Sequence, residues 1–139
     1  MINNFRGEYR FLSNFFPAPV TYRGLTYKNN EAAFQAQKDL SRLKEFTQLD
    51  PSAAKRLGRR VRLRSDWEEV KLDIMEDIVR AKFTQNQDLA QKLLNTYPQQ
   101  LVEGNNWNDT FWGVCRGKGN NALGLILMVI RNELQNKGG

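Results

Sequence analysis

The first forty residues show two changes in the pattern of apolar and polar positions. Thr21–Tyr27 is a run of β-branched and aromatic residues around an Arg-Gly pair, which predicts two short strands joined by a tight turn. Asn29 and Asn30 are favourable helix caps. We therefore expect a helix to begin near Glu31 and to run to about Leu40.

Most of the remaining sequence predicts helices. They cover Pro51–Gly58, Trp67–Phe83, a segment from Asp88 that ends before Pro98, and a last helix through Ala122–Ile130. The last helix is apolar nearly all round, so we expect it to be buried at the centre. The segment 105–121, rich in Asn and Gly, is expected to form a long ordered loop. These elements predict one α+β domain over residues 1–139, mainly helical, with a buried C-terminal helix and small antiparallel strand pairs.

The composition of the chain excludes several kinds of metal site and catalytic mechanism. The 139 residues include no histidine and one cysteine, Cys115, which excludes His/Cys zinc sites and Ser-His or Cys-His nucleophiles. Acid–base catalysis then falls to carboxylates, lysines, tyrosines or the single thiol, and we expect no metal or other cofactor. The sequence has no long apolar window and no apolar N-terminal run, so a cytoplasmic protein with no membrane partner is expected.

The charge balance favours an anionic ligand. There are 21 basic and 15 acidic residues, a net charge of +6, which suits a phosphate-bearing small molecule or a nucleic acid. The densest basic run is Lys55–Arg64, which is either a solvated surface or a nucleic-acid contact. It lacks the interleaved aromatic residues that stack on single-stranded bases.

Two lysines fall inside the apolar arc of the predicted helix Trp67–Phe83. Lys71 and Lys82 lie at roughly 40° and 60° from Trp67 on a helical wheel. Such a lysine extends its ammonium group to the rim, pairs with a buried carboxylate, or lines a site as a phosphate ligand or an amine of lowered pKa. Two of them on one strip indicate that this helix borders a site.

The predicted helix after Asn30 places Glu31, Phe34, Gln35 and Lys38 on one face, at the spacings i, i+3, i+4 and i+7. Glu31 either contributes to a site on this face or simply favours the positive end of the helix dipole.

The long loop supplies a third candidate. Tryptophans 107 and 112 either stack on a flat base or fill the edge of the core. Asp109 is a possible carboxylate partner for Glu31. The glycines from Gly113 to Gly119 precede a helix, an arrangement that suits an anion, although no P-loop motif is present.

Taken in order along nearly the whole chain, several stretches resemble the YbiA-like, or NADAR, family. They are Phe11–Phe15, Asn30-Glu31, Gln35–Lys38, Asp66–Glu68, Lys71, Arg80–Phe83, Leu101–Glu103, Asp109, Trp112-Gly113 and Gly119–Gly124. The sequence departs from the family at Ala32, where members often carry histidine, and at Val114–Arg116, which is less glycine-rich.

This resemblance implies an N-glycosidase that cleaves the base–ribose bond of a phosphorylated ribosyl substrate. Some members of the family act on early riboflavin-pathway intermediates, and others remove ADP-ribose from modified guanine in nucleic acid. The resemblance assigns Glu31, Trp67, Asp109 and Trp112 to the active site, Lys82 to catalysis or phosphate binding, and Ser13 and Asn14 to a turn that lines the substrate.

The resulting hypothesis names three catalytic residues. Glu31 or Asp109 stabilises the cationic sugar while the other orients water or protonates the base, or else Lys82 attacks the opened sugar as an amine. The expected substrate-binding residues are Ser13, Asn14, Lys38, Arg64, Trp67, Lys71, Trp112 and Gly113. The alternative is a non-catalytic domain that binds ADP-ribose or nucleic acid, and the oligomeric state stays open.

Overall fold

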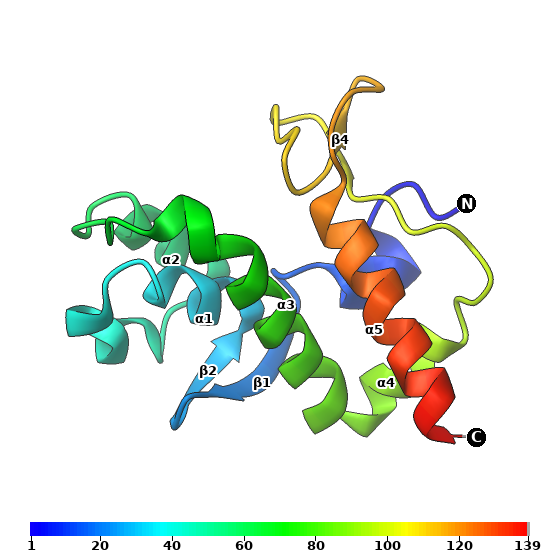
Figure 1. The fold of residues 1–139 in the computed structure, drawn as a ribbon, viewed down its shortest axis with the longest axis horizontal. Helices are drawn as coiled ribbons and strands as arrows, with labels where there is room; N and C mark the ends of the chain where they lie inside the picture. Colours follow the sequence, from blue (N-terminus) through cyan, green and yellow to red (C-terminus); the bar gives the residue numbers. More distant parts are fainter. Residues whose placement is uncertain (139) are drawn as a thin grey trace. The chain divides into compact units, whose positions relative to one another are not determined.

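The computed structural model describes residues 1–138, which divide into two compact units, residues 14–86 and residues 1–13 with 87–138. Figure 1 labels most of their elements. In chain order these are η1 (Gly7–Leu12), β1 (Pro17–Tyr22), β2 (Leu25–Asn29), α1 (Asn30–Ala36), η2 (Leu40–Phe46), α2 (Pro51–Gly58), α3 (Trp67–Gln85), α4 (Gln87–Leu94), β3 (Gly104–Asn105), β4 (Val114–Cys115) and α5 (Ala122–Gly138), where η marks a 3-10 helix. Within the described residues, no helix has both the length and the hydropathy to cross a membrane.

The unit of residues 14–86 contains the predicted hairpin. Strands β1 and β2 pair antiparallel, with Val20 opposite Tyr27. Arg23 and Gly24 form the turn with φ values of 51° and 87°. Positive φ at both positions is the requirement of a type I′ turn, whose twist matches that of the strands. Val20 and Tyr27 are buried, so the hairpin has one face in the core of this unit.

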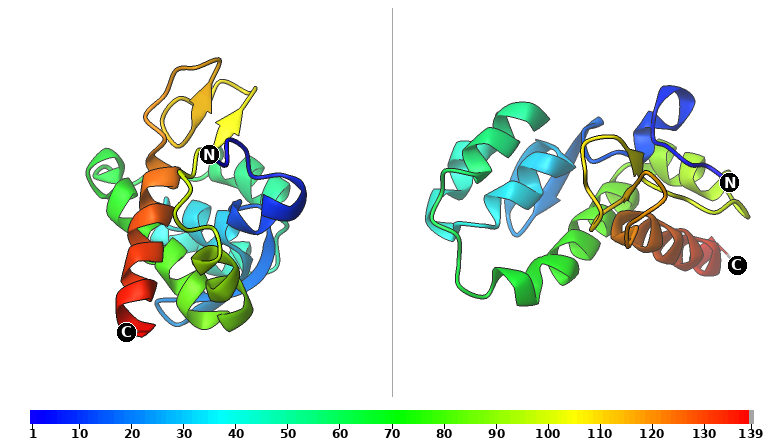
Figure 2. Two further views of the ribbon diagram at one scale, coloured as in Figure 1. Left: turned by 90° about the vertical axis from the view of Figure 1, so that its right-hand side faces the viewer. Right: turned by 90° about the horizontal axis from the view of Figure 1, so that it is seen from above.

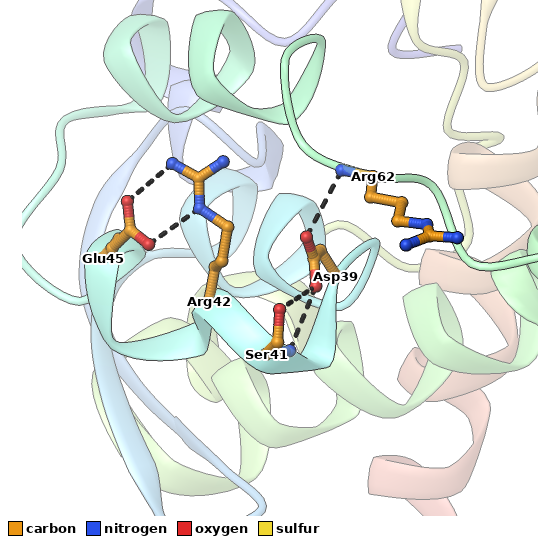
Figure 3. A network of polar contacts seen from close by, with 5 residues as sticks. All are labelled: Asp39, Ser41, Arg42, Glu45 and Arg62. Atoms are coloured by element: carbon orange, nitrogen blue, oxygen red, sulfur yellow. Dashed lines mark hydrogen bonds and ion pairs between the residues drawn. The ribbon is translucent and has the colours of Figure 1, made fainter.

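Helix α1 follows the hairpin directly, and all seven of its residues are buried. The Asn29 side chain accepts a hydrogen bond from the Ala32 N–H at 2.7 Å, as expected for a cap. The helix ends at Ala36 rather than at about Leu40. Asp39 then takes an extended conformation, and its carboxylate caps η2 through Ser41 and accepts from the Arg62 N–H (Figure 3). These contacts, one of them to a residue far along the chain, accompany the early end of the helix.

Helix α2 begins and ends as predicted. The Asp50 carboxylate accepts from the Ala53 N–H at 2.8 Å, and Pro51 occupies the first turn. Gly58 is the last residue, but the reason differs from a C-terminal glycine cap. Gly58 is buried, and a Cβ atom there would collide with the Gln35 side chain, so close packing requires the glycine.

Helix α3 carries much of the apolar surface of the same unit, with Ile74, Met75, Ile78, Val79 and Phe83 buried. At its start the Asp66 carboxylate makes no capping hydrogen bond, and Leu72 is 46% exposed although it is apolar.

The second unit is built around α5, against which α4 packs (Figure 1). Helix α4 begins at Gln87 and ends at Leu94, so it is shorter than the segment available before Pro98. The yellow and orange segment after it lies at the N-terminal end of α5 (Figure 2). It is less irregular than predicted, because β3 and β4 form a two-residue pair within it. That pair is parallel, whereas the hairpin is antiparallel as expected.

Helix α5 is buried on one side. Leu123, Ile126, Leu127 and Ile130 are buried, at the i, i+3, i+4, i+7 spacing of one helix face. Leu125 and Val129, on another face, are 55% and 48% exposed. The apolar sequence therefore predicted a more completely buried helix than the structure shows.

Candidate active site

The first candidate site is called the α1 cluster. It consists of Glu31, Phe34 and Gln35 from α1, Lys38 from the turn that follows α1, and Trp67 from α3. Glu31 is 9% exposed, and its Oε2 atom accepts a hydrogen bond from Gln35 Nε2 at 2.6 Å. The Glu31 N–H donates to the Asn14 carbonyl at 3.1 Å. A buried carboxylate is thus held at the start of a short helix by contacts to both its backbone and its side chain.

A cation and two aromatic rings accompany this carboxylate. Lys38 Nζ lies 5.8 Å from the centroid of the Trp67 ring, within range of a cation–π interaction. The Phe34 and Trp67 ring centroids are 5.0 Å apart. Burial lowers the pKa of Lys38, while the Glu31 carboxylate opposes the shift. The positive charges of Arg59 and Lys55 also lower this pKa, so basic residues of α2 and the following turn act on the α1 cluster.

Buried amide side chains lie next to Glu31, and they belong to residues that the sequence patterns had already named, Asn14, Asn30 and Gln35. Asn14 Oδ1 accepts from Asn30 Nδ2 at 3.3 Å, and Asn14 Nδ2 lies 3.4 Å from Met75 Sδ. The buried acceptors Asn30 Oδ1 and Gln35 Oε1 have no hydrogen-bond partner among the described residues. On a helical wheel Asn30, Glu31 and Gln35 share one side of α1, and the three alanines of this helix lie on the other.

Lys82 is buried on α3, 1% exposed. Its Nζ atom lies 5.0 Å from the Phe83 ring centroid and 5.6 Å from that of Phe16. Burial lowers the pKa of Lys82 to about 7. The interpretation in which the ammonium group reaches solvent is therefore wrong for Lys82, because burial keeps this amine from water and favours its neutral form.

Lys71 and Arg64 differ from Lys82 because each already has an acidic partner. Lys71 Nζ lies 2.7 Å from the Glu68 carboxylate, which is 77% exposed, so this lysine does extend toward the surface. Arg64 contacts both oxygens of Asp66, at 2.6 and 3.1 Å. A substrate phosphate would have to compete with these carboxylates.

Asp109 organises the loop of the other unit. Its Oδ1 atom accepts from the N–H groups of Phe111 at 3.1 Å and Trp112 at 2.9 Å. Asn105 holds Asp109 in turn through the Asp109 N–H and carbonyl. Trp112 is half-buried against the Phe111 ring, with centroids 4.7 Å apart and nearly perpendicular planes. One oxygen of this carboxylate therefore positions Trp112.

Gly113 is explained by packing. A Cβ atom there would lie 2.7 Å from Asn105 Nδ2 and would overlap the carbonyl and carboxylate oxygens of Glu103. The N-terminal N–H groups of α5 are also occupied, because Ala122 and Leu123 donate to the carbonyls of Phe111 and Trp112. These contacts argue against an anion at this helix terminus.

The predicted site residues are distributed over both units. Asn14, Glu31, Lys38 and Trp67 come together, and Arg64 adjoins them through its N–H bond to the Lys38 carbonyl. Lys71 and Lys82 lie on α3 in the same unit. Ser13, Asp109, Trp112 and Gly113 belong to the other. No group of three or more His, Cys, Asp or Glu residues within positions 1–138 is arranged to hold a metal ion.

The hairpin, the buried helix α1 and the carboxylate–lysine–indole cluster belong to a small, mainly helical α+β protein. A family model, the NADAR domain, matches residues 3–135. The chain belongs to the NADAR family.

Similar proteins cover most of the sequence. N-glycosidase YbiA of Escherichia coli is 41% identical over 133 residues, which span 91% of this chain and 82% of that protein. The riboflavin biosynthesis protein VVA0006 of Vibrio vulnificus is 42% identical over 131 residues, but the chain spans only 35% of its length. The NMR structure of E. coli YbiA has a TM-score of 0.86 at 37% identity, and covers 99% of this chain and 89% of that one.

Proposed function

We propose that this protein is an N-glycosidase that hydrolyses the base–ribose bond of a phosphorylated ribosyl substrate in the cytoplasm. The observation that carries the proposal is the buried Glu31 carboxylate, held by Gln35 and accompanied by Lys38 and Trp67. The relatives named N-glycosidase, from E. coli and from Nostoc punctiforme, support it, the second at 35% identity over 92% of this chain.

The chemistry follows from charge. Breaking the bond develops positive charge at the anomeric carbon and negative charge on the leaving nitrogen. The Glu31 carboxylate stabilises the positive charge at the anomeric carbon, and a proton is delivered to the leaving nitrogen. A water molecule then adds its hydroxyl group to the anomeric carbon. Trp67 offers a face to the base. Asp109 is the proposed second carboxylate. It would act through Oδ2, because Oδ1 accepts the hydrogen bonds that hold the loop.

Lys82 supports a second route to the same products. The neutral Lys82 amine adds to C1 of the ring-opened substrate, where C1 is still joined to the base nitrogen as an imine. The C1–nitrogen bond to the base breaks, the base leaves with the two protons of the lysine amine, and a Schiff base between Lys82 and the sugar forms. Water then hydrolyses this Schiff base, which releases the sugar and regenerates the amine. Borohydride trapping of a sugar adduct on the wild type, absent from Lys82→Ala, supports this route, and no adduct counts against it.

The remaining predicted residues are proposed to bind substrate. They are Ser13, Asn14, Lys38, Arg64, Lys71, Trp112 and Gly113. Lys38 is the best supported of the cations because it adjoins Glu31, whereas Lys71 and Arg64 are already paired.

Two substrate classes fit the proposal, an early riboflavin-pathway intermediate and ADP-ribosylated guanine. Relatives named as riboflavin biosynthesis proteins, in V. vulnificus and in Zea mays, favour the first. Incubation with both compounds and mass spectrometry of the products should detect a free base from one of them. Absence of base from both would contradict the proposed function.

The alternative is a non-catalytic binder of ADP-ribose or nucleic acid. The exposed side chains of Arg56, Arg59, Arg60 and Arg62 favour it, because they form a basic surface of the kind that contacts phosphates. Such a domain would bind polyanions without releasing any base.

A further inference from the structure

The Gln35 side chain is confined between Glu31 and Gly58. Gln35 is 6% exposed, and its Nε2 atom donates to Glu31 Oε2 at 2.6 Å. A Cβ atom on Gly58 would lie 2.8 Å from Gln35 Cδ and 3.3 Å from Gln35 Cβ, and would overlap Oε1. The amide therefore has a carboxylate on one side and the α2 backbone on the other.

The orientation of this amide leaves a buried acceptor without a partner. Gln35 Oε1 makes no hydrogen bond among residues 1–138. Reversing the amide would bring Oε1 against the Glu31 oxygen, which repels it when the carboxylate is ionised. A fold that leaves a buried acceptor unpaired loses stability, so this arrangement calls for an explanation. The donor it provides to Glu31 is that explanation.

Gly58 has no conformational reason to be glycine. It ends α2 with helical geometry before Arg59, and its φ is not in the left-handed region. What the position requires is the absence of a side chain, because the Gln35 amide occupies the space that a Cβ atom would take. Two elements, α1 and α2, thus fix the direction in which the Glu31 carboxylate points.

We propose that Gln35, buttressed by Gly58, is a positioning residue that orients the Glu31 carboxylate toward the reacting sugar. The inference rests on the proposed glycosidase function, in which Glu31 carries the chemistry. A charge-assisted hydrogen bond restricts the orientation of a carboxylate more strongly than a hydrogen bond between neutral groups does. Because that orientation matters for the reacting carboxylate, loss of the bond should affect turnover more than substrate binding.

A double-mutant cycle tests the proposal. Gln35→Ala should lower kcat about ten-fold with KM changed less than about two-fold, because the lost contact is to the reacting carboxylate. Gly58→Ala should lower kcat through displacement of the amide. The double variant should be no slower than Gln35→Ala alone, since both changes act through one contact. Additive losses, or a change confined to KM, would overturn the proposal.

Gln37→Ala is the matched control. Gln37 is also a buried glutamine of this segment, but its side chain donates to the Ala33 carbonyl at 3.0 Å. Its removal should leave kcat within about two-fold, once thermal melting shows the variant to be folded. An equal loss of kcat in Gln37→Ala would assign the effect to general destabilisation and refute a positioning role.

A second measurement does not depend on activity. The Gln35 side-chain NH₂ resonances of the wild type, observed by NMR, should be protected from solvent exchange. Glu31→Ala and Gly58→Ala should each remove that protection, whereas Gln37→Ala should not. Absent base release in the wild type would refute the proposed function alone. Loss of protection in none of the variants would refute the role of Gln35 alone.

Discussion

Glu31 is the residue on which the proposed chemistry depends most directly. Glu31→Gln keeps the volume and the contact region of the side chain but removes its charge. We expect base release to fall by at least about 10²-fold, since a carboxylate that stabilises the cationic sugar cannot be replaced by an amide. The rate of product formation under saturating substrate measures this. Glu45→Gln, which alters an exposed glutamate paired with Arg42, is the control and should keep near-normal turnover.

Lys82 should leave a signature in stability as well as in activity. Its pKa of about 7 in the folded protein is below the ordinary value of 10.5. Between these values the unfolded chain binds the proton and the folded chain does not, so stability rises with pH across this window. Lys82→Met should abolish this rise. From about pH 7 to about pH 9 the wild type should gain about 2 kcal/mol relative to the variant.

Urea unfolding of both proteins at several pH values measures the difference. Lys71→Met provides the comparison, because Lys71 lies on the same helix but pairs with an exposed glutamate. Its stability relative to the wild type should change little over the same range. Parallel curves for the wild type and Lys82→Met would show that the amine is not desolvated.

At the scale of elements, two substitutions in the 105–121 loop distinguish a structural role of Asp109 from a chemical role. Asp109→Asn keeps an Oδ1 acceptor for the Phe111 and Trp112 N–H groups, so the loop should retain its conformation. Asp109→Ala removes that acceptor and should destabilise the protein by about 1–3 kcal/mol. Thermal unfolding of both variants checks this difference.

Turnover of Asp109→Asn then decides the chemical question. A loss of about 10²-fold in a variant of normal stability assigns acid–base work to the carboxylate. Near-normal turnover would restrict Asp109 to holding Trp112.

Element boundaries show where local signals were sufficient. The Arg23-Gly24 turn and the start of α2 at Pro51 were predicted correctly, because turn conformation and helix capping depend on neighbouring residues. The end of α1 was missed. It depends on Asp39, whose carboxylate contacts the N–H of Arg62, far along the chain.

At the scale of the whole molecule, charge distinguishes the two candidate functions. A glycosidase for a small phosphorylated substrate should show a modest dependence of kcat/KM on salt. A nucleic-acid binder should lose affinity steeply as salt rises, and Arg60→Ala should reduce the slope of log K against log salt by about 1. Fluorescence titration with an oligonucleotide at several salt concentrations measures this. A steep slope without base release would favour the binder.

Much of the candidate site was accessible from local patterns. The spacing of Glu31, Gln35 and Lys38 predicted one helix face. The structure shows Gln35 bonded to Glu31 on α1, but Lys38 lies beyond the end of that helix. The apolar neighbours of Lys82 left three interpretations open, one of which includes a lowered pKa, and burial on α3 lowers this pKa to about 7. The apolar run of the last helix misjudged Val129, because hydropathy does not reveal which apolar face has a partner.

The sequence by itself determined the mainly helical α+β class, the hairpin turn, the absence of histidine chemistry and the family. Each of these follows from composition, local conformational preference or a pattern spread along the whole chain. Tertiary structure alone decided that Gln35 donates to Glu31 against Gly58, that Lys71 is paired while Lys82 is buried, and that Asp109 holds Trp112. The physical reason is that burial and side-chain partners depend on neighbours brought together by folding, so they are not properties of any single segment.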